Sequence, residues 1–132
     1  MKLYSMIFTL IISSVAFAQS SDLYACLEQN DSVVSREECQ HEEFKRLDEA
    51  LTRIVSQEVS AIHGRRAGAV VKDEFAQLFQ SQRQFKASRE SVCQTEVADM
   101  DGGTGQGFQK LECMNRLTQQ RIDFLQQKFG SR

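Results

Sequence analysis

The chain contains no proline and no tryptophan, and His41 and His63 are its only imidazoles. The absence of proline, in a sequence rich in Glu, Gln, Arg and Leu, favours long uninterrupted helices. Two isolated histidines offer no evident nucleophile–base pair. The motifs G-x-S-x-G, G-x-x-x-x-G-K-[S/T] and H-E-x-x-H are also missing. These absences exclude the common hydrolase, phosphate-loop and zinc-protease signatures, and we expect a protein that is not an enzyme.

Neither sign of charge dominates the sequence. Sixteen Lys and Arg stand against 18 Asp and Glu, which gives a net charge of −2. A nucleic-acid site would require a basic stripe, so no nucleic-acid partner is expected. Asp99-x-Asp101-Gly102 begins like a calcium loop, but Lys110 occupies the position that needs a bidentate Glu. We therefore expect no cofactor, and a protein partner fits the mild acidity.

The longest apolar run lies at the N-terminus, from Met6 to Val15. Lys2 precedes this run, and Ala16-Phe17-Ala18 places small residues where a signal peptidase reads them. The run is too short to span a membrane as a helix. We therefore predict a signal peptide at residues 1–18, cleavage near Ala18, and a mature single domain at 19–132. The mature protein is expected in the periplasm or the medium, without a membrane span.

Four cysteines follow, and their spacing favours disulfides over a metal site. Cys26, Cys39, Cys93 and Cys113 form no C-x-x-C pair, and the two histidines do not complete a zinc set. An even number of cysteines in a small exported domain is typical of disulfide bonds. Sequence alone allows three pairings.

Helical periodicity begins after a capping signal. Ser35 and Glu38 match a capping box, which predicts that the first helix begins near residue 36. Gly64 is expected as a left-handed cap that ends this helix near residue 63. The apolar stripe of the helix is formed by Phe44, Leu47, Leu51, Ile54 and Ile62. Its outer face, with Glu42, Glu43, Glu49 and Arg53, is expected to lie in water.

The second predicted helix, at about 69–97, carries polar residues on its core face. Its stripe advances in alternating steps of four and three, through Val71, Phe75, Leu78, Gln82, Phe85, Arg89 and Val92. A buried unpaired guanidinium would cost several kcal/mol. We therefore expect Gln82, Arg89 and Arg121 to bond between helices, with Asp48 and Glu42 as the nearest acids. The alternative is that Arg89 lays its stem over Phe44 and reaches water.

A glycine-rich loop precedes a third predicted helix, at about 108–129. Short connections between long amphipathic helices predict a small antiparallel three-helix bundle of the all-α class. In this arrangement all four cysteines fall near one pole. The pairing Cys26–Cys39 with Cys93–Cys113 is favoured because each bond closes a loop that needs a tether, while a crossed pairing stays open. Each bond would contribute about 3 kcal/mol.

The second half of the chain resembles the LprI-type lysozyme-inhibitor family. The motif Gln82-Arg83-Gln84-Phe85 is followed by Arg89 and Cys93, as in a family pattern whose aromatic residue is usually Trp. The remaining matches lie outside this motif: Cys26, Cys39, Asp48 and Leu51 before it, and Gly102-Gly103, Cys113, Leu117-Thr118, Arg121 and Leu125 after it. The resemblance covers about residues 26 to 125. It implies an exported helical module that binds a lysozyme, although this chain has no lipidated cysteine.

An inhibitor must enter or cover the cleft of its enzyme. The turn between the first two predicted helices offers a basic tip with Arg65 and Arg66. Glu37, Glu38, Glu42 and Glu43 offer an acidic patch for a basic lysozyme. Competing hypotheses are a structural or stress-related envelope module that associates with itself, and immunity to a secreted toxin. The sequence allows a monomer or a homodimer and does not name the target.

Overall fold

The computed structural model describes residues 20–65, 69–100, 102–103 and 105–130. Within these ranges the chain forms four α-helices, a short 3-10 turn and no strand. They are α1 (Ser21–Glu28), α2 (Val33–Arg65), α3 (Ala69–Glu96), η1 (Ala98–Met100) and α4 (Gln106–Gly130). The all-helical class is therefore confirmed, but the expected number of three helices is wrong. The predicted signal peptide at residues 1–18 lies outside the described residues.

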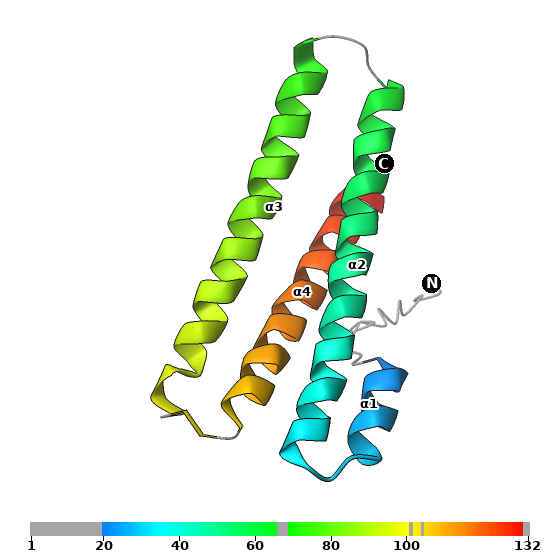
Figure 1. The fold of residues 1–132 in the computed structure, drawn as a ribbon. Coiled ribbons are helices and arrows are strands. Elements are labelled where there is room, and N and C mark those ends of the chain that lie inside the picture. The colour runs from blue at the N-terminus through cyan, green and yellow to red at the C-terminus, as the bar shows by residue number, and fades with distance from the viewer. Residues whose placement is uncertain (1–19, 66–68, 101, 104, 131–132) are drawn as a thin grey trace, which may run out of the picture.

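Figure 1 shows α2 and α3 as a long antiparallel hairpin, with α4 beside them. The helix α2 has 33 residues and α4 has 25. At 1.5 Å per residue, α2 is about 50 Å long, and α4 is about 12 Å shorter. The hairpin consequently extends beyond the end of α4, and α1 lies against the opposite end of α2 (Figure 1).

The additional helix, α1, has eight residues and only one buried side chain, Leu23. A single buried position gives no helical period, so the sequence contained no detectable stripe. The Ser20 hydroxyl accepts from the backbone N–H of Leu23 at 3.2 Å and caps the helix. The Cys26–Cys39 disulfide then ties α1 to the start of α2. A helix this short is marginal in water without such a tether.

Both predicted boundaries of α2 are displaced. The helix begins at Val33, and the Ser32 hydroxyl accepts from the backbone N–H of Ser35 at 3.1 Å. The capping residue is therefore Ser32, three residues before the predicted Ser35. At the other end α2 continues to Arg65, and Gly64 does not adopt the left-handed backbone expected of a cap. Among the described glycines only Gly102 has positive φ, +67°, in the turn that leads into α4.

The main core lies between α2, α3 and α4. Its buried members are Leu47, Leu51, Val55, Ile62, Leu78, Ile122 and Leu125. A second cluster surrounds the Cys93–Cys113 disulfide and includes Met114, with Phe44 packed against it. At the end of α3 the buried face is shifted by one residue from the predicted stripe: Val92 is 47% exposed, whereas Cys93 is fully buried. None of the helices in the described residues has the length and apolarity that crossing a membrane requires.

Both disulfides follow the pairing favoured by loop closure. Cys26 bonds to Cys39 and Cys93 bonds to Cys113, and no described cysteine is free. The two bonds lie at the same pole of the molecule, where α2 and α4 begin and α3 ends (Figure 1). Two such bonds are expected only in an oxidising compartment, which agrees with an exported protein.

Candidate functional site

The polar residues on the core face of α3 make contacts with both neighbouring helices. Arg89, only 6% exposed, places Nη1 3.2 Å from Asp48 Oδ1 on α2 and 2.8 Å from Thr118 Oγ1 on α4. Its guanidinium also lies 4.8 Å from the centre of the Phe44 ring. Arg89 is therefore held inside by partners, and its head does not extend into water. Asp48 is its acidic partner, while Glu42 pairs with a neighbour on its own helix.

Arg121 and Gln82 form a second bridge, between α4 and α3. The Arg121 Nε donates to Gln82 Oε1 at 2.9 Å, and its Nη2 donates to Ser81 Oγ at 2.6 Å. The guanidinium also lies 5.5 Å from the centre of the Phe85 ring. Burial lowers the pKa of Arg121 from its ordinary value. The structure thus pairs Gln82 with Arg121 and Asp48 with Arg89, and both guanidinium groups contact the Phe85 ring.

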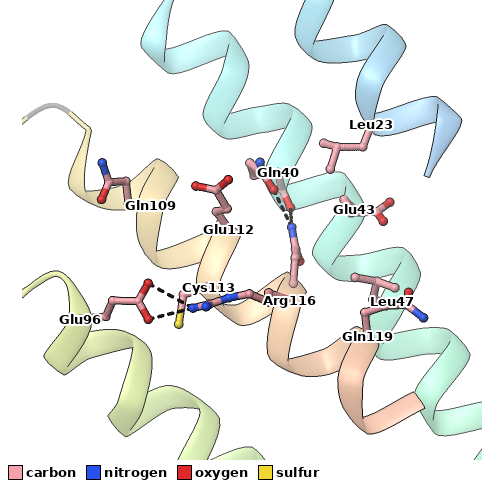
Figure 2. A pocket seen from close by; sticks show the side chains of 11 residues that line it. Leu23, Gln40, Glu43, Leu47, Glu96, Gln109, Glu112, Cys113, Arg116 and Gln119 are labelled. Carbon is pink, nitrogen blue, oxygen red and sulfur yellow. Dashed lines mark hydrogen bonds and ion pairs between the residues drawn. The ribbon is translucent and has the colours of Figure 1, made fainter. Parts of the chain in front are cut away.

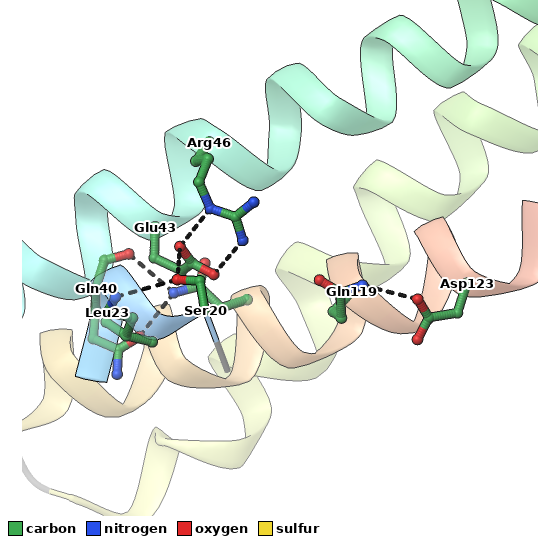
Figure 3. A network of polar contacts seen from close by, with 8 residues as sticks. Ser20, Leu23, Gln40, Glu43, Arg46, Gln119 and Asp123 are labelled. Atoms are coloured by element: carbon green, nitrogen blue, oxygen red, sulfur yellow. Dashed lines mark hydrogen bonds and ion pairs between the residues drawn. The ribbon is translucent and has the colours of Figure 1, made fainter. Parts of the chain in front are cut away.

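One member of the predicted acidic patch is buried. Glu43 is 7% exposed and accepts from Arg46 at 2.6 and 2.8 Å and from the Ser20 hydroxyl at 2.9 Å (Figure 3). The hydrogen bond and the charge of Glu43 raise the pKa of Arg46 despite partial burial of the guanidinium. The expectation that Glu43 belongs to a solvated face is therefore wrong. Its position was misread because α1 covers it.

The other predicted acidic contacts, Glu37, Glu38 and Glu42, are more accessible than Glu43. Glu38 and Glu42 are exposed, and Glu42 forms an ion pair with Lys45 at 3.4 Å. Glu37 is half-buried beside the first turn of α4, where its carboxylate approaches Gly107. Arg65 is the last residue of α2, and the predicted contact at Arg66 lies outside the described residues.

A pocket of about 360 Å³ lies between α1, α2 and α4. Figure 2 shows Leu23 entering from α1 and Gln40 and Leu47 from α2, with Glu112 and Gln119 on the α4 side. At its edge the Arg116 guanidinium pairs with the Glu96 carboxylate at 2.8 Å. Apolar atoms form most of the accessible lining. A pocket of this size is within the range of small-molecule sites.

Two buried amide side chains among the residues that line this pocket contact each other. Asn115 is 6% exposed, and its Nδ2 donates to the backbone carbonyl of Gln40 at 2.9 Å and to Gln40 Oε1 at 2.8 Å. Gln40 is only 1% exposed. Among the described residues, Gln40 Nε2 and Asn115 Oδ1 are buried without a hydrogen-bond partner, as is Arg89 Nε on α3. A buried polar group left in this state costs about 1–3 kcal/mol.

Sequence reasoning missed this amide pair, although a signal was present. Gln40 precedes Phe44 by four residues and Leu47 by seven, so it continues the apolar stripe of α2. Asn115 similarly lies four residues after Leu111 and seven before Ile122. A polar residue on a core stripe predicts an internal partner on either helix. Extending that rule from α3 to α2 and α4 would have found both amides.

No cluster of three or more His, Cys, Asp or Glu side chains in the described part of the chain could hold a metal ion. The four cysteines are used in disulfides, and the buried acid Glu43 is occupied by Arg46 and Ser20. What the described side chains do provide is the pocket and the exposed charged residues on α2.

One comparison with known proteins gives a match. A family model described as "Lysozyme inhibitor LprI" covers residues 26–125. Its limits contain both disulfides, the two polar bridges and the amide pair. No curated protein and no solved structure matches the chain at a significant level.

Proposed function

Because the chain belongs to the LprI lysozyme inhibitor family, we propose that it is an exported protein-binding module that inhibits a lysozyme. The family match over residues 26–125 is the observation that carries this proposal. The two disulfides support it, since they fix the helices into a rigid body and binding then costs little ordering entropy. We further propose that residues 1–18 are a signal peptide and that the mature protein acts in the periplasm or outside the cell.

Two surfaces are candidates for contact with the enzyme. Arg65 and Arg66, at and just after the end of α2, would present positive charge to the two carboxylates of a lysozyme cleft. Glu38 and Glu42, exposed near the opposite end of α2, would instead face a basic rim. Charge at either surface would accelerate association more than it tightens the complex. The two surfaces lie far apart along α2, so separate variants distinguish them.

The test is a lytic assay with purified oxidised protein against animal, phage and bacterial lysozymes. Inhibition of at least one enzyme at nanomolar to micromolar concentration is expected. Absence of inhibition in all three groups would contradict the proposed function. A sedimentation measurement on the same sample determines whether the active species is a monomer or a homodimer.

Matched charge variants then locate the contact surface. Replacing Arg65 and Arg66 by Ala should weaken inhibition about tenfold or more, which corresponds to about 1.4 kcal/mol. The control is the double variant Arg53→Ala and Arg83→Ala, because both side chains are exposed and the charge change is identical. Undiminished inhibition by the first variant, with loss in a Glu38→Gln and Glu42→Gln variant, would move the contact to the acidic surface.

A further inference from the structure

We propose that a second pocket, between α3 and α4, binds a small monocarboxylate that carries a ring or another flat apolar group. The pocket measures about 370 Å³, and α2 contributes the buried side chains Glu58 and Ile62 to its lining. Arg121 and Lys128 on α4 also line it. The binding proposed here involves no lysozyme, so it can fail while enzyme inhibition stands, and the reverse also holds.

The Arg121 guanidinium has one edge that no described protein group uses. The group is planar and carries five N–H donors. Its Nε and Nη2 donate to Gln82 and Ser81, which occupies the edge between these two nitrogens. Within the described residues Nη1 has no hydrogen-bond partner, yet it is not among the side-chain nitrogens and oxygens that are buried without one. Nη1 is therefore accessible, and the Nη1–Nη2 edge is open to an acceptor from outside the chain.

The guanidinium lies between side chains that line the pocket. Ser81, which accepts from Nη2 at 2.6 Å, is a lining residue on α3. Phe124 is another lining residue, and its ring centre is 5.5 Å from Arg121 Cζ. Phe124 is 51% exposed, and its ring centre is also 5.9 Å from Lys128 Nζ. A carboxylate bound to Arg121 would therefore have an accessible aromatic ring beside it, with a second cation close to that ring.

The charges in the pocket favour a monoanion. Neither Arg121 nor Lys128 forms an ion pair in the described part of the chain, and burial alone lowers the pKa of Arg121. Glu58 and Glu74 also line the pocket, but each already has an interaction partner. A half-buried guanidinium with neutral partners is stabilised by an anion, and its planar fork matches the two oxygens of a carboxylate. A doubly charged phosphate would be repelled more strongly by the two glutamates.

Nuclear magnetic resonance of the oxidised mature protein, labelled with ¹⁵N, tests the site directly. Benzoate is the probe, and its titration should shift the Nε–H signal of Arg121, with a dissociation constant on the order of 1 mM. Benzamide has the same shape without the charge, and inorganic phosphate has the charge without the ring. Each should bind at least fivefold more weakly than benzoate. Equal binding of benzamide or of phosphate, or no shift with benzoate, would overturn the proposal.

The variant Arg121→Lys keeps the positive charge and removes the paired N–H edge. Benzoate should bind this variant at least fivefold more weakly, as followed by the backbone signals of Ser81 and Phe124. Arg116→Lys is the matched control, because it makes the same substitution on α4 at an arginine that pairs with Glu96 and lines the other pocket. Its affinity should stay within twofold of the unmodified protein. A loss smaller than fivefold in Arg121→Lys, with unchanged helical circular dichroism, would refute the role of the guanidinium.

Discussion

Replacement of Arg89 by Met measures what the polar bridge on α3 contributes to stability. The variant loses charge-assisted hydrogen bonds to Asp48 and Thr118, each worth about 1.5–3 kcal/mol. It also loses cation–π contacts with Phe44 and Phe85, worth about 1 kcal/mol. Burial of the methionine returns about 1–2 kcal/mol, and removal of Arg89 Nε, which is buried without a hydrogen-bond partner, returns about 1–3 kcal/mol. We expect a net loss of about 2 kcal/mol, which lowers the melting temperature by about 8 °C in a domain of this size.

The partners that remain limit the damage. Asp48 is 29% exposed and keeps Lys86 at 3.3 Å, so it is not left as an isolated buried charge. The control is Lys86→Met, since Lys86 contacts the same carboxylate from a half-exposed position. It should cost less than about 0.5 kcal/mol, as exposed ion pairs do.

Thermal and urea unfolding of Arg89→Met, Asp48→Asn and their double variant complete the measurement. The double-mutant cycle should give a coupling energy of about 1–2 kcal/mol between the two side chains. An Arg89→Met melting temperature equal to or above that of the unmodified protein would refute the reasoning. That result would mean that the arginine is tolerated by the core without stabilising it.

Three further predictions concern the ends of the helices. Replacing both Cys26 and Cys39 by Ala should cost about 3 kcal/mol and should increase amide exchange in α1 before the other helices, as measured by hydrogen exchange. Gly64→Ala should raise the unfolding free energy by about 0.5–1 kcal/mol, because this glycine is helical with open space around it; a loss would restore the predicted left-handed cap. Gly107→Ala should raise the unfolding free energy less than Gly64→Ala does, because its new Cβ would press on the Glu37 carboxylate. In a Glu37→Ala background, urea unfolding should show the same gain for both glycine substitutions.

The sequence predicted those parts of the fold that repeat. Helices α2, α3 and α4 each keep an apolar stripe over several turns, so their existence and approximate limits could be read without coordinates. The helix α1 lacks this repetition, because Leu23 is its single buried side chain. The predicted start of α2 was wrong for a local reason. Ser32 and Ser35 can both cap a helix, and in the structure Ser32 accepts from the backbone N–H of Ser35.

Burial of polar residues was predictable where the residue falls on a repeating apolar stripe. Arg89 and Gln82 fall on the stripe of α3, which predicts that they need partners, and the hairpin arrangement brings Asp48 within reach of Arg89. Glu43 also has internal partners, but its burial depends on α1, which the sequence did not reveal. Because α1 was not predicted, Glu43 was wrongly assigned to the solvated face of α2.

We infer that the polar groups favour one register of the bundle over others that its apolar stripes would tolerate. The buried side chains in the described part of α3 are Leu78, Gln82, Arg89 and Cys93, and Val97, just after the helix, is also buried. Stripes of leucine and phenylalanine tolerate sliding by one turn, because similar side chains recur every three or four residues. A hydrogen bond from Arg89 to Thr118, or from Arg121 to Gln82, is lost by the same movement. The Cys93–Cys113 disulfide and these two hydrogen bonds therefore hold α3 in one axial register against α4. Such buried polar contacts contribute specificity as well as energy, which is what a rigid binding surface requires.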